Sequence, residues 1–383
     1  MLLCLLTFSY MYNFLIVGQG LAGSVLADHL MATGKKVMVI DDPTYSNTSK
    51  VSAGLFNPIV FKRLTKTYMA DEALKAARDF YTLQELKLKT RFYYPRNLYK
   101  LFSEQREIDF WNKKADEHLL NDLGGTAPNY LRKGPSPLPS FVEAEWGAGG
   151  VVEAGNVEVN VFLQCYANYL RERGLLLEER FDYNALEFSG EKVESGKGFK
   201  TVTYKGIQAE KIIFCEGFRS QENPYFKGIP FKLTKGEILT IRIPDLSESD
   251  LLYRDIVTKL GFLLPLGNGL FRVGATYNWQ DLTENTTSEG LAELKLKLER
   301  LLNRPYEIVE QKAGVRPTVS DRRPLLGFHP LYRNLGIFNG LGTKGILLAP
   351  YFAQLMAIHS ITGLPIDSEV DVNRYFSKGT YGG

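Results

Sequence analysis

Cysteine and histidine are scarce in this sequence, and their scarcity argues against a metal centre. Only three cysteines and four histidines occur in 383 residues. The cysteines, Cys4, Cys165 and Cys215, form no CxxC pair, and no two histidines stand at the i, i+4 spacing of a zinc motif. We therefore expect no metal site. An odd and small number of cysteines also favours a reduced, cytoplasmic compartment.

An excess of one charge is absent as well. The chain holds 46 Lys and Arg against 43 Asp and Glu, which gives a formal net charge of +3. Since a dedicated nucleic-acid binder carries a basic excess, bulk charge predicts no nucleic-acid partner. Hydrophobic residues make up 44% and charged residues 23% of the chain, as is typical of a globular protein. The length suits two domains or one large α/β domain with an insertion.

Long hydrophobic runs are missing apart from a short one at the N-terminus. Residues 1–10, MLLCLLTFSY, are too few to span a bilayer and lack both a charged start and a small-residue cleavage signal. Because Met11 directly precedes the first expected strand, we interpret residues 1–10 as an extension or a start-site artefact; a membrane tether is the alternative. No other run predicts a membrane span.

After residue 10 the sequence predicts a strand, a helix and a second strand. Residues 12–17 are a short apolar run of the buried-strand type, and residues 21–33 have a helical pattern. Gly34 is the glycine expected after a helix C-terminus. Residues 36–40 then predict a second buried strand. This order is that of a βαβ unit.

Glycines between the first strand and the helix predict a bound dinucleotide. Gly18, Gly20 and Gly23 have the spacing that allows a tight turn, approach of the backbone to a pyrophosphate, and close helix–strand packing. Asp41 ends the second strand, 23 residues after Gly18, where a carboxylate can accept from ribose hydroxyls. An acidic residue at that point argues against a 2′-phosphate. The alternative is a glycine-rich turn without a ligand.

Later stretches predict more helices and a second kind of sheet. Residues 211–215 and 335–338 read as further buried strands. Between residues 231 and 277, short alternating runs separated by Pro or Gly turns predict an antiparallel sheet. Amphipathic or apolar helices are expected at 68–92, where the apolar spacing is clearest over 70–85, and at 160–174, 288–303 and 346–361.

Three further stretches carry a more specific signal. Residues 49–58, SKVSAGLFNP, are rich in small residues, so their backbone can approach a flat ring or a phosphate closely; the alternative is a surface loop. Residues 313–318, AGVRPT, are followed by DRRPLLG at 321–327. Residues 339–350 read NGLGTKGILLAP.

With these stretches the sequence resembles the flavin-dependent amine oxidoreductases of the D-amino-acid oxidase superfamily, whose nearer members include glycine oxidase and sarcosine oxidase. KGEIL at 235–239 and RVGAT at 272–276 are similar to the family as well. The resemblance runs in order from about Tyr12 to Gly363. It implies an α/β fold: a Rossmann-type FAD-binding domain of discontinuous segments plus an antiparallel-sheet α+β substrate domain. We expect the FAD-binding domain at 11–70, 151–222 and 310–365, the substrate domain at 71–150 and 223–309, and a C-terminal tail at 366–383.

The resemblance also implies the cofactor and the residues around it. The cofactor would be FAD, held non-covalently because no cysteine follows Cys215. The implied contacts are Gly18, Gly20, Gly23 and Asp41 at the ADP half, backbone near Phe181 or Asp182 beside the adenine, Ser52, Ala53 and Gly54 along the pyrophosphate and isoalloxazine, Gly217 near the pyrophosphate, and Gly340, Gly342, Thr343, Lys344, Gly345 and Ile346 around the pyrimidine edge.

The helix that follows Lys344 has a physical role in this picture. Two-electron reduction of a flavin leaves negative charge near N1, which a helix N-terminus and the Lys344 ammonium would stabilise. The alternative for Lys344 is a solvated lysine on a loop.

Arg316 is the residue implied for substrate binding. In the resembling oxidases, the arginine of this Gly-x-Arg-Pro run pairs with the substrate carboxylate, and a planar guanidinium suits that bidentate contact. The alternative is a structural arginine paired with Asp321. Phe262 stands where glycine oxidase has a tyrosine, and Tyr277 stands where it has a methionine, so the pocket is expected to differ. Each of these two residues is either pocket lining or plain core.

The expected function is oxidation of the C–N bond of a small amine or amino acid. The resemblance implies hydride transfer to flavin N5, an imine that water hydrolyses, and reoxidation by oxygen or another acceptor. Two alternatives stay open. One is oxidation of a carboxymethylaminomethyl group on a tRNA wobble uridine, and the other is a redox-silent FAD-binding protein.

Overall fold

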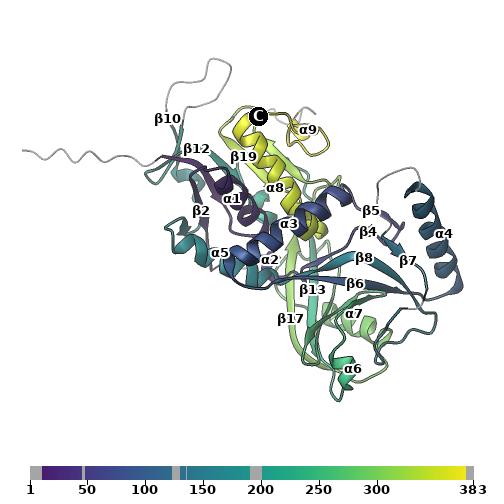
Figure 1. Ribbon diagram of the computed structural model, residues 1–383. Coiled ribbons are helices and arrows are strands. Elements are labelled where there is room, and N and C mark those ends of the chain that lie inside the picture. Colours follow the sequence, from purple (N-terminus) through teal and green to yellow (C-terminus); the bar gives the residue numbers. More distant parts are fainter. Residues whose placement is uncertain (1–10, 45–47, 123–129, 135, 190–200, 377–383) are drawn as a thin grey trace, which may run out of the picture.

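Two large β-sheets organise the described part of the chain (Figure 1). The first is a largely parallel sheet covered by helices, and the second is a largely antiparallel sheet that extends away from it. Both kinds of sheet are as the sequence predicts. The computed structural model describes residues 11–44, 48–122, 130–134, 136–189 and 201–376.

The first sheet is built on β1 (Met11–Val17), which lies between β2 (Val37–Asp41) and β12 (Ile207–Phe214). Both neighbours run parallel to β1, and their buried, β-branched and aromatic side chains explain the near-continuous apolar runs in the sequence. The remaining strands of this sheet are β9 (Leu176–Glu178), β10 (Leu186–Ser189), β11 (Thr201–Tyr204), β18 (Leu325–Phe328) and β19 (Leu335–Asn339).

Four helices pack on the first sheet or on one another. They are α1 (Leu21–Ala32), α3 (Ala70–Leu88), α5 (Val159–Arg171) and α8 (Gly345–Thr362). Helix α8 contacts both α1 and α3 (Figure 1). Within the described residues, only the stretch 342–362 is long and apolar enough to cross a membrane by those two criteria. More than half of its apolar window is buried, as in the core helix of a folded domain.

The second sheet has the strand order β17-β13-β16-β15-β14-β6-β8-β3, with β7 paired to β8. Its bounds are β3 (Leu55–Phe56), β6 (Tyr93–Leu101), β7 (Leu131–Arg132), β8 (Ala148–Val157), β13 (Thr234–Arg242), β14 (Ile256–Thr258), β15 (Phe262–Gly267), β16 (Leu270–Gly274) and β17 (Glu307–Arg316).

Two longer helices, α7 and α4, and several short elements complete the described structure. Helix α7 (Ser288–Glu299) buries Leu294 and Leu298 in a core shared with β13, β15 and β16. The others are α2 (Thr48–Val51), β4 (Ile59–Val60), β5 (Thr65–Lys66), α4 (Gln105–Asp122), η1 (Tyr183–Ala185), η2 (Gly217–Gln221), α6 (Glu248–Leu251), η3 (Gly342–Lys344) and α9 (Asn373–Phe376). Helix α4 was not among the helices expected from the sequence.

Three segments lie elsewhere than the expected domain boundaries place them. Residues 151–157 belong to β8, and residues 310–316 belong to β17, so both segments pair within the second sheet. Each of these two strands is ten residues long. Helix α3, expected in the substrate domain, packs chiefly against α8, and its buried face of Ala, Leu and aromatic side chains joins a core to which both sheets contribute.

The expected C-terminal tail is also part of the fold as far as residue 376. The backbone N–H of Leu326 donates to Val370 and that of Val372 donates to Leu326, which ties this segment to β18. Val370 and Val372 are fully buried, so the segment forms core rather than a tail. Residues 377–383 and 1–10 lie outside the described residues.

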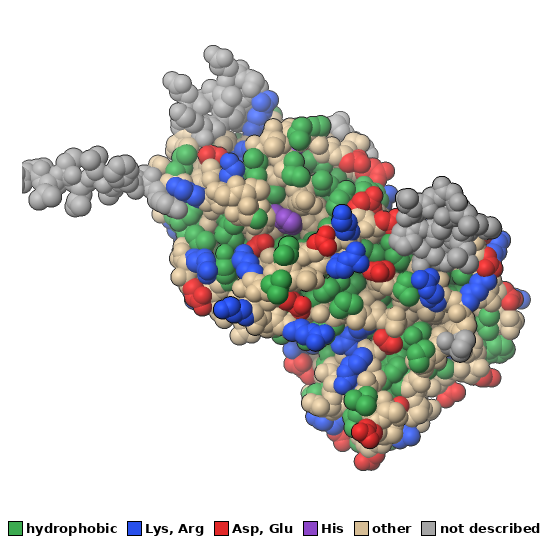
Figure 2. Space-filling model, viewed as in Figure 1, with side chains coloured by type: hydrophobic (Ala, Val, Ile, Leu, Met, Phe, Trp, Pro, Cys, Tyr) green, Lys and Arg blue, Asp and Glu red, His purple; other side chains and the backbone are tan. Residues whose placement is uncertain are grey.

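The surface shown in Figure 2 carries basic and acidic side chains in mixture. No large area of one sign covers that face, in keeping with the net charge of +3.

Candidate active site

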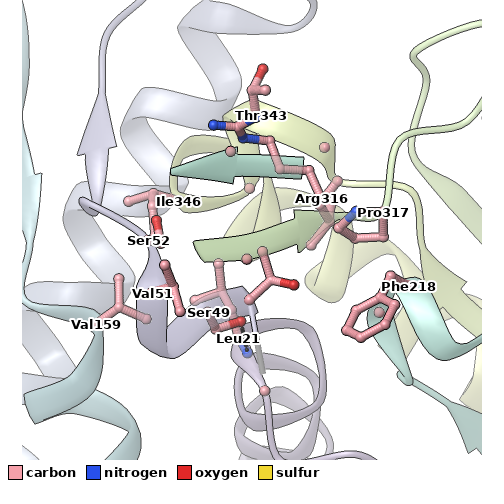
Figure 3. A pocket seen from close by; sticks show the side chains of 18 of the residues that line it. Leu21, Ser49, Val51, Ser52, Val159, Phe218, Arg316, Pro317, Thr343 and Ile346 are labelled. Carbon is pink, nitrogen blue, oxygen red and sulfur yellow. Dashed lines mark hydrogen bonds between the residues drawn. The ribbon is translucent and has the colours of Figure 1, made fainter. Parts of the chain in front are cut away.

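One large pocket lies between the two sheets. Its volume is about 610 Å³, which is within the range of small-molecule and cofactor sites. Figure 3 shows side chains from α1 (Leu21), from the segment around α2 (Ser49, Val51, Ser52), from the start of α8 (Ile346) and from the end of β17 (Arg316) arranged around this space. Segments far apart in sequence therefore meet here.

The turn between β1 and α1 forms one wall. Gly18 has a φ of +105°, and a β-carbon there would stand 2.5 Å from the carbonyl oxygen of Cys215. Gly20 precedes α1 without a side-chain cap and lines the pocket with Gly18, so the helix N-terminus faces the space. Gly23 lies behind the turn, where a β-carbon would meet the carbonyl of Gly18 at 1.8 Å.

Asp41 lines the pocket at the end of β2, next to that turn. It accepts a hydrogen bond of 2.9 Å from the backbone N–H of Gln19, and burial raises the pKa of its carboxyl. Phe181 lines the same end. Asp182 does not; its carboxylate accepts from the backbone of Asn184 and caps η1.

The segment after α2 and the start of α8 supply much of the middle of the pocket. Ser52, Ala53 and Gly54 line it, and Gly54 must be glycine because a β-carbon would stand 1.8 Å from the carbonyl oxygen of Val157. Gly340 lies outside the lining and forms the turn before η3. The other predicted residues, Gly217, Gly342, Thr343, Lys344, Gly345 and Ile346, line the pocket.

Lys344 is not the solvated loop lysine that the alternative would require. Its ammonium donates to the backbone oxygen and the side-chain oxygen of Asn57, both at 3.1 Å, and to the backbone oxygen of Ile59 at 3.2 Å. Burial lowers the pKa of Lys344 to about 8. The ammonium therefore ties the start of α8 to the loop between β3 and β4.

Glu216 is a site residue that the sequence analysis missed. It lies at the end of β12 against the pocket wall and accepts hydrogen bonds from the hydroxyl of Tyr183 and from the amide of Asn223. Burial raises the pKa of its carboxyl to about 7. In the sequence, the only indication of a role for Glu216 is its position directly after an apolar strand.

Arg316 reaches the pocket as a cation without an acidic partner among the described residues. Its guanidinium makes only long contacts with the backbone oxygens of Lys235, at 3.5 Å, and Thr276, at 3.4 Å. Burial lowers its pKa, which reflects the cost of enclosing an unpaired charge. Asp321, the alternative partner, instead pairs with Arg374 at 2.9 Å. An anionic ligand would offset the desolvation of Arg316.

The acidic lining residues gather towards one end of the pocket, whereas basic lining residues occur along its whole length. Asp41, Asp42, Glu179 and Glu216 lie at or just after the ends of strands of the first sheet, and Glu222 follows η2; Arg180 and Arg219 line the pocket in the same region. Arg316 and Lys259 lie at the end formed by the second sheet. The end around Arg316 thus favours a negative group.

Phe262 and Tyr277 both line the pocket at the Arg316 end. Phe262 is half-buried and also packs on the main core. Tyr277 is 52% exposed, so the alternative of plain core is wrong for this residue. Its ring lies 4.7 Å from the central carbon of the Arg316 guanidinium.

The pocket fits a dinucleotide such as FAD. The cradle formed by Gly18 and Gly20 would be filled by a side chain, and the N-terminus of α1 faces the space for a pyrophosphate, with the N–H of Leu21 donating to the hydroxyl of Ser49 at 3.2 Å. Asp41 lines the pocket beside this turn, and the same space also reaches Arg316. The described residues hold no group of three or more His, Cys, Asp or Glu placed to bind a metal.

Comparison with known proteins agrees with this geometry. The model of the family described as FAD dependent oxidoreductase matches residues 13–358. The chain belongs to this family. It is an FAD-dependent oxidoreductase of the amino-acid oxidase type, which confirms the expected family, cofactor and class of enzyme.

Individual relatives extend over almost the whole chain. Glycine oxidase of Bacillus licheniformis is 26% identical over 378 residues, which cover 94% of this chain and 95% of that enzyme. The tRNA 5-methylaminomethyl-2-thiouridine biosynthesis bifunctional protein MnmC of Marinobacter nauticus is 22% identical over 89% of this chain, but the match covers only 54% of that protein. The crystal structure of glycine oxidase from Geobacillus kaustophilus superposes with a TM-score of 0.73 at 19% identity, covering 94% of this chain and 96% of the other.

Proposed function

We propose that this flavoenzyme oxidises the C–N bond of an amine that carries a carboxylate. The observation that carries the proposal is Arg316, a largely buried guanidinium in the pocket with no acidic partner among the described residues. Planar guanidinium groups bind carboxylates in a bidentate manner, and the pairing restores the interactions that burial removes.

The pocket residues divide into a cofactor set and a substrate set. Gly18, Gly20 and Asp41 would hold the ADP half of FAD, and residues 52–54 together with 342–346 would lie along the rest of the cofactor. Arg316 and Tyr277 would contact the substrate. When bound, FAD supplies an acceptor for a hydride at N5.

The reaction balances without a side-chain base. The substrate carbon loses a hydride and its nitrogen loses a proton, which leaves a C=N double bond. Water adds to that bond, and the products are a carbonyl compound and a free amine. Arg316 would fix the carboxylate so that the α-carbon faces the acceptor, and positioning of this kind supplies much of the rate acceleration. Oxygen or another acceptor takes the electrons afterwards.

Anaerobic mixing of the yellow holoprotein with a panel of amines tests the proposal. We expect carboxylate-bearing amines to bleach the flavin absorbance and matched amines without the carboxylate to fail. Arg316→Ala should retain FAD but lose about 2–5 kcal/mol in kcat/KM for the best carboxylate substrate. Arg304→Ala is the matched control, since Arg304 is exposed and lies outside the pocket lining.

Two outcomes would overturn the proposal. Unchanged kinetics of Arg316→Ala on the best substrate would remove Arg316 from the site. A flavin that stays yellow with every amine would favour the redox-silent FAD-binding protein.

A second candidate is oxidation of a carboxymethylaminomethyl group on tRNA uridine. It is favoured by the match to the bifunctional protein MnmC, of which this chain covers about half. That group also holds a carboxylate and a secondary amine, so Arg316 would serve it equally. Anaerobic bleaching by tRNA that carries the group, but not by tRNA that lacks it, would identify this substrate.

We also propose a cytoplasmic location. Cys165 and Cys215, the two cysteines within the described residues, are both free thiols, as a reducing compartment would allow.

A further inference from the structure

Exposed apolar side chains continue outward from Arg316. Tyr277 is 52% exposed and Trp279 is 64% exposed, and their rings stack with centroids 6.3 Å apart and planes inclined by 28°. Leu260, between β14 and β15, lines the pocket and is 53% exposed. We call Tyr277, Trp279 and Leu260 the apolar shelf. Exposed large apolar side chains that gather beside a binding group mark a surface that a ligand covers.

Hydrogen bonds fix the segment that carries Tyr277 and Trp279. Asn278, between the two aromatic residues, exchanges backbone hydrogen bonds of 2.8 and 3.0 Å with Lys235 of β13. The side chain of Asn278 accepts from the backbone of Gln280 and Asp281. Asp281 in turn pairs with the buried ammonium of Lys235. In this extended segment, residues 277 and 279 project to the same side.

The shelf starts at the carboxylate site and leads away from the cofactor. The guanidinium of Arg316 lies on one side of the Tyr277 ring at 4.7 Å, and Trp279 stacks with the same ring. Tyr277 lines the pocket, whereas Trp279 lies outside the lining. Arg316, Tyr277 and Trp279 therefore run from the interior to the surface, and a cofactor bound along residues 52–54 and 342–346 would leave Trp279 uncovered.

From this arrangement we infer the substrate class, an inference that rests on the proposed function. The substrate is an amine whose carboxylate pairs with Arg316 and which also carries a large aromatic or apolar group that covers the shelf. A substrate as small as glycine or sarcosine would leave Tyr277, Trp279 and Leu260 in water. A larger group removes this apolar area from water on binding.

Two pairs of amines test the inference. Sarcosine is compared with N-benzylglycine, and alanine with phenylalanine in both enantiomers, by anaerobic flavin reduction in a stopped-flow instrument. We expect the larger member of at least one pair to reduce the flavin with a ratio of rate to dissociation constant about tenfold higher or more. Equal values, or higher values for the small members in both pairs, would overturn the inference while leaving the proposed function intact. If no carboxylate-bearing amine bleaches the flavin, the proposed function itself fails.

A binding measurement without turnover gives a second readout. Acetate, phenylacetate and 3-phenylpropionate are titrated into the holoprotein by calorimetry and by tryptophan fluorescence. We expect the aromatic acids to bind about tenfold or more tightly than acetate and to change the fluorescence of Trp279. The fluorescence change should vanish in Trp279→Phe. Equal affinities for the three acids would count against the shelf as a substrate surface.

Variants of the shelf separate its role from folding. Trp279→Ala and Leu260→Ala should reduce the preference for the larger ligands several-fold and leave the affinity for acetate nearly unchanged. Both residues are more than half exposed, so the fold should survive. Leu86→Ala is the matched control, because Leu86 is 73% exposed on α3 and lies outside the pocket lining. A preference that persists in both shelf variants would overturn the inference.

Discussion

The guanidinium of Arg316 lies directly over Gly236, in the facing strand. A β-carbon on residue 236 would stand 2.0 Å from Nη2 of Arg316 and 2.4 Å from its central carbon. Strands β13 and β17 pair so that Gly236 opposes Gly314 and Arg316 opposes Thr234. The Arg316 side chain can therefore cross β13 to reach the pocket only because residue 236 has no side chain.

The first prediction follows from this contact. Gly236→Ala should displace the guanidinium and lower kcat/KM for a carboxylate substrate by about tenfold or more, because a misplacement of about 1 Å can cost that much or more in rate. FAD content should stay near that of the wild type. Stopped-flow flavin reduction and the flavin-to-protein absorbance ratio measure the two quantities.

Gly150→Ala is the control for a methyl group added to the same sheet. Its β-carbon would come no closer than 3.3 Å to a neighbour and would lie away from Arg316. Wild-type kinetics in Gly236→Ala would mean that Arg316 does not bind the substrate from the position described here.

The second prediction concerns Glu216 and the pH dependence of stability. Burial raises the pKa of the folded carboxyl to about 7 from its ordinary value of 4.5. Between these two pH values the unfolded chain releases the proton while the folded chain keeps it. The free energy of unfolding is therefore unaffected by this group below pH 4.5 and decreases as the pH rises towards 7. The loss is about 1.4 kcal/mol per pH unit within this window.

Glu216→Gln should remove that loss. A glutamine keeps an oxygen to accept from Asn223 and an N–H to donate to Tyr183, and it does not ionise. We expect the free energy of unfolding of the variant, minus that of the wild type, to be larger at pH 8 than at pH 5. Urea unfolding of both proteins at both pH values measures this difference. A difference between the two proteins that is the same at both pH values would contradict the raised pKa.

Local features of the site could be predicted from the sequence, because each depends on neighbours along the chain. The turn of Gly18, Gly20 and Gly23 is one such feature, and it lies between β1 and α1 as expected. The dinucleotide pattern and the resembling stretches also indicated the family that the comparisons confirm.

Features set by long-range pairing could not be predicted in the same way. Gly236 and Arg316 meet across 80 residues of sequence, and nothing local to either residue indicates the contact. Residues 151–157 and 310–316 mix apolar with polar or charged side chains and suit a strand in either sheet, so composition alone could not assign them to the second. Helix α3 was misplaced for a related reason: an amphipathic pattern shows that a helix has a buried face but not what covers it.

The last prediction concerns Lys344 as an anchor for the wall of the pocket. Its ammonium donates to three acceptor oxygens on Asn57 and Ile59, so Lys344→Met should remove this donor from the backbone oxygens of both residues and free the loop between β3 and β4, while the side-chain oxygen of Asn57 keeps the N–H of Ile59. Each unsatisfied buried acceptor costs about 1–3 kcal/mol, and release of a buried charge offsets part of that loss. We expect a net loss of about 1–3 kcal/mol in the free energy of unfolding at pH 7 and weaker retention of FAD.

The dependence on pH makes the Lys344 test specific. Since burial lowers its pKa to about 8 from 10.5, the folded state carries the penalty of a buried charge below pH 8, and this penalty fades as the pH rises towards 10.5. Lys344→Met should therefore lose more stability relative to the wild type at pH 9.5 than at pH 7, as measured by urea unfolding. Lys62→Met, which alters an exposed lysine on the adjoining segment, should behave as the wild type at both values. If Lys344→Met keeps full stability and binds FAD as tightly as the wild type, the anchor is not needed to hold the pocket wall.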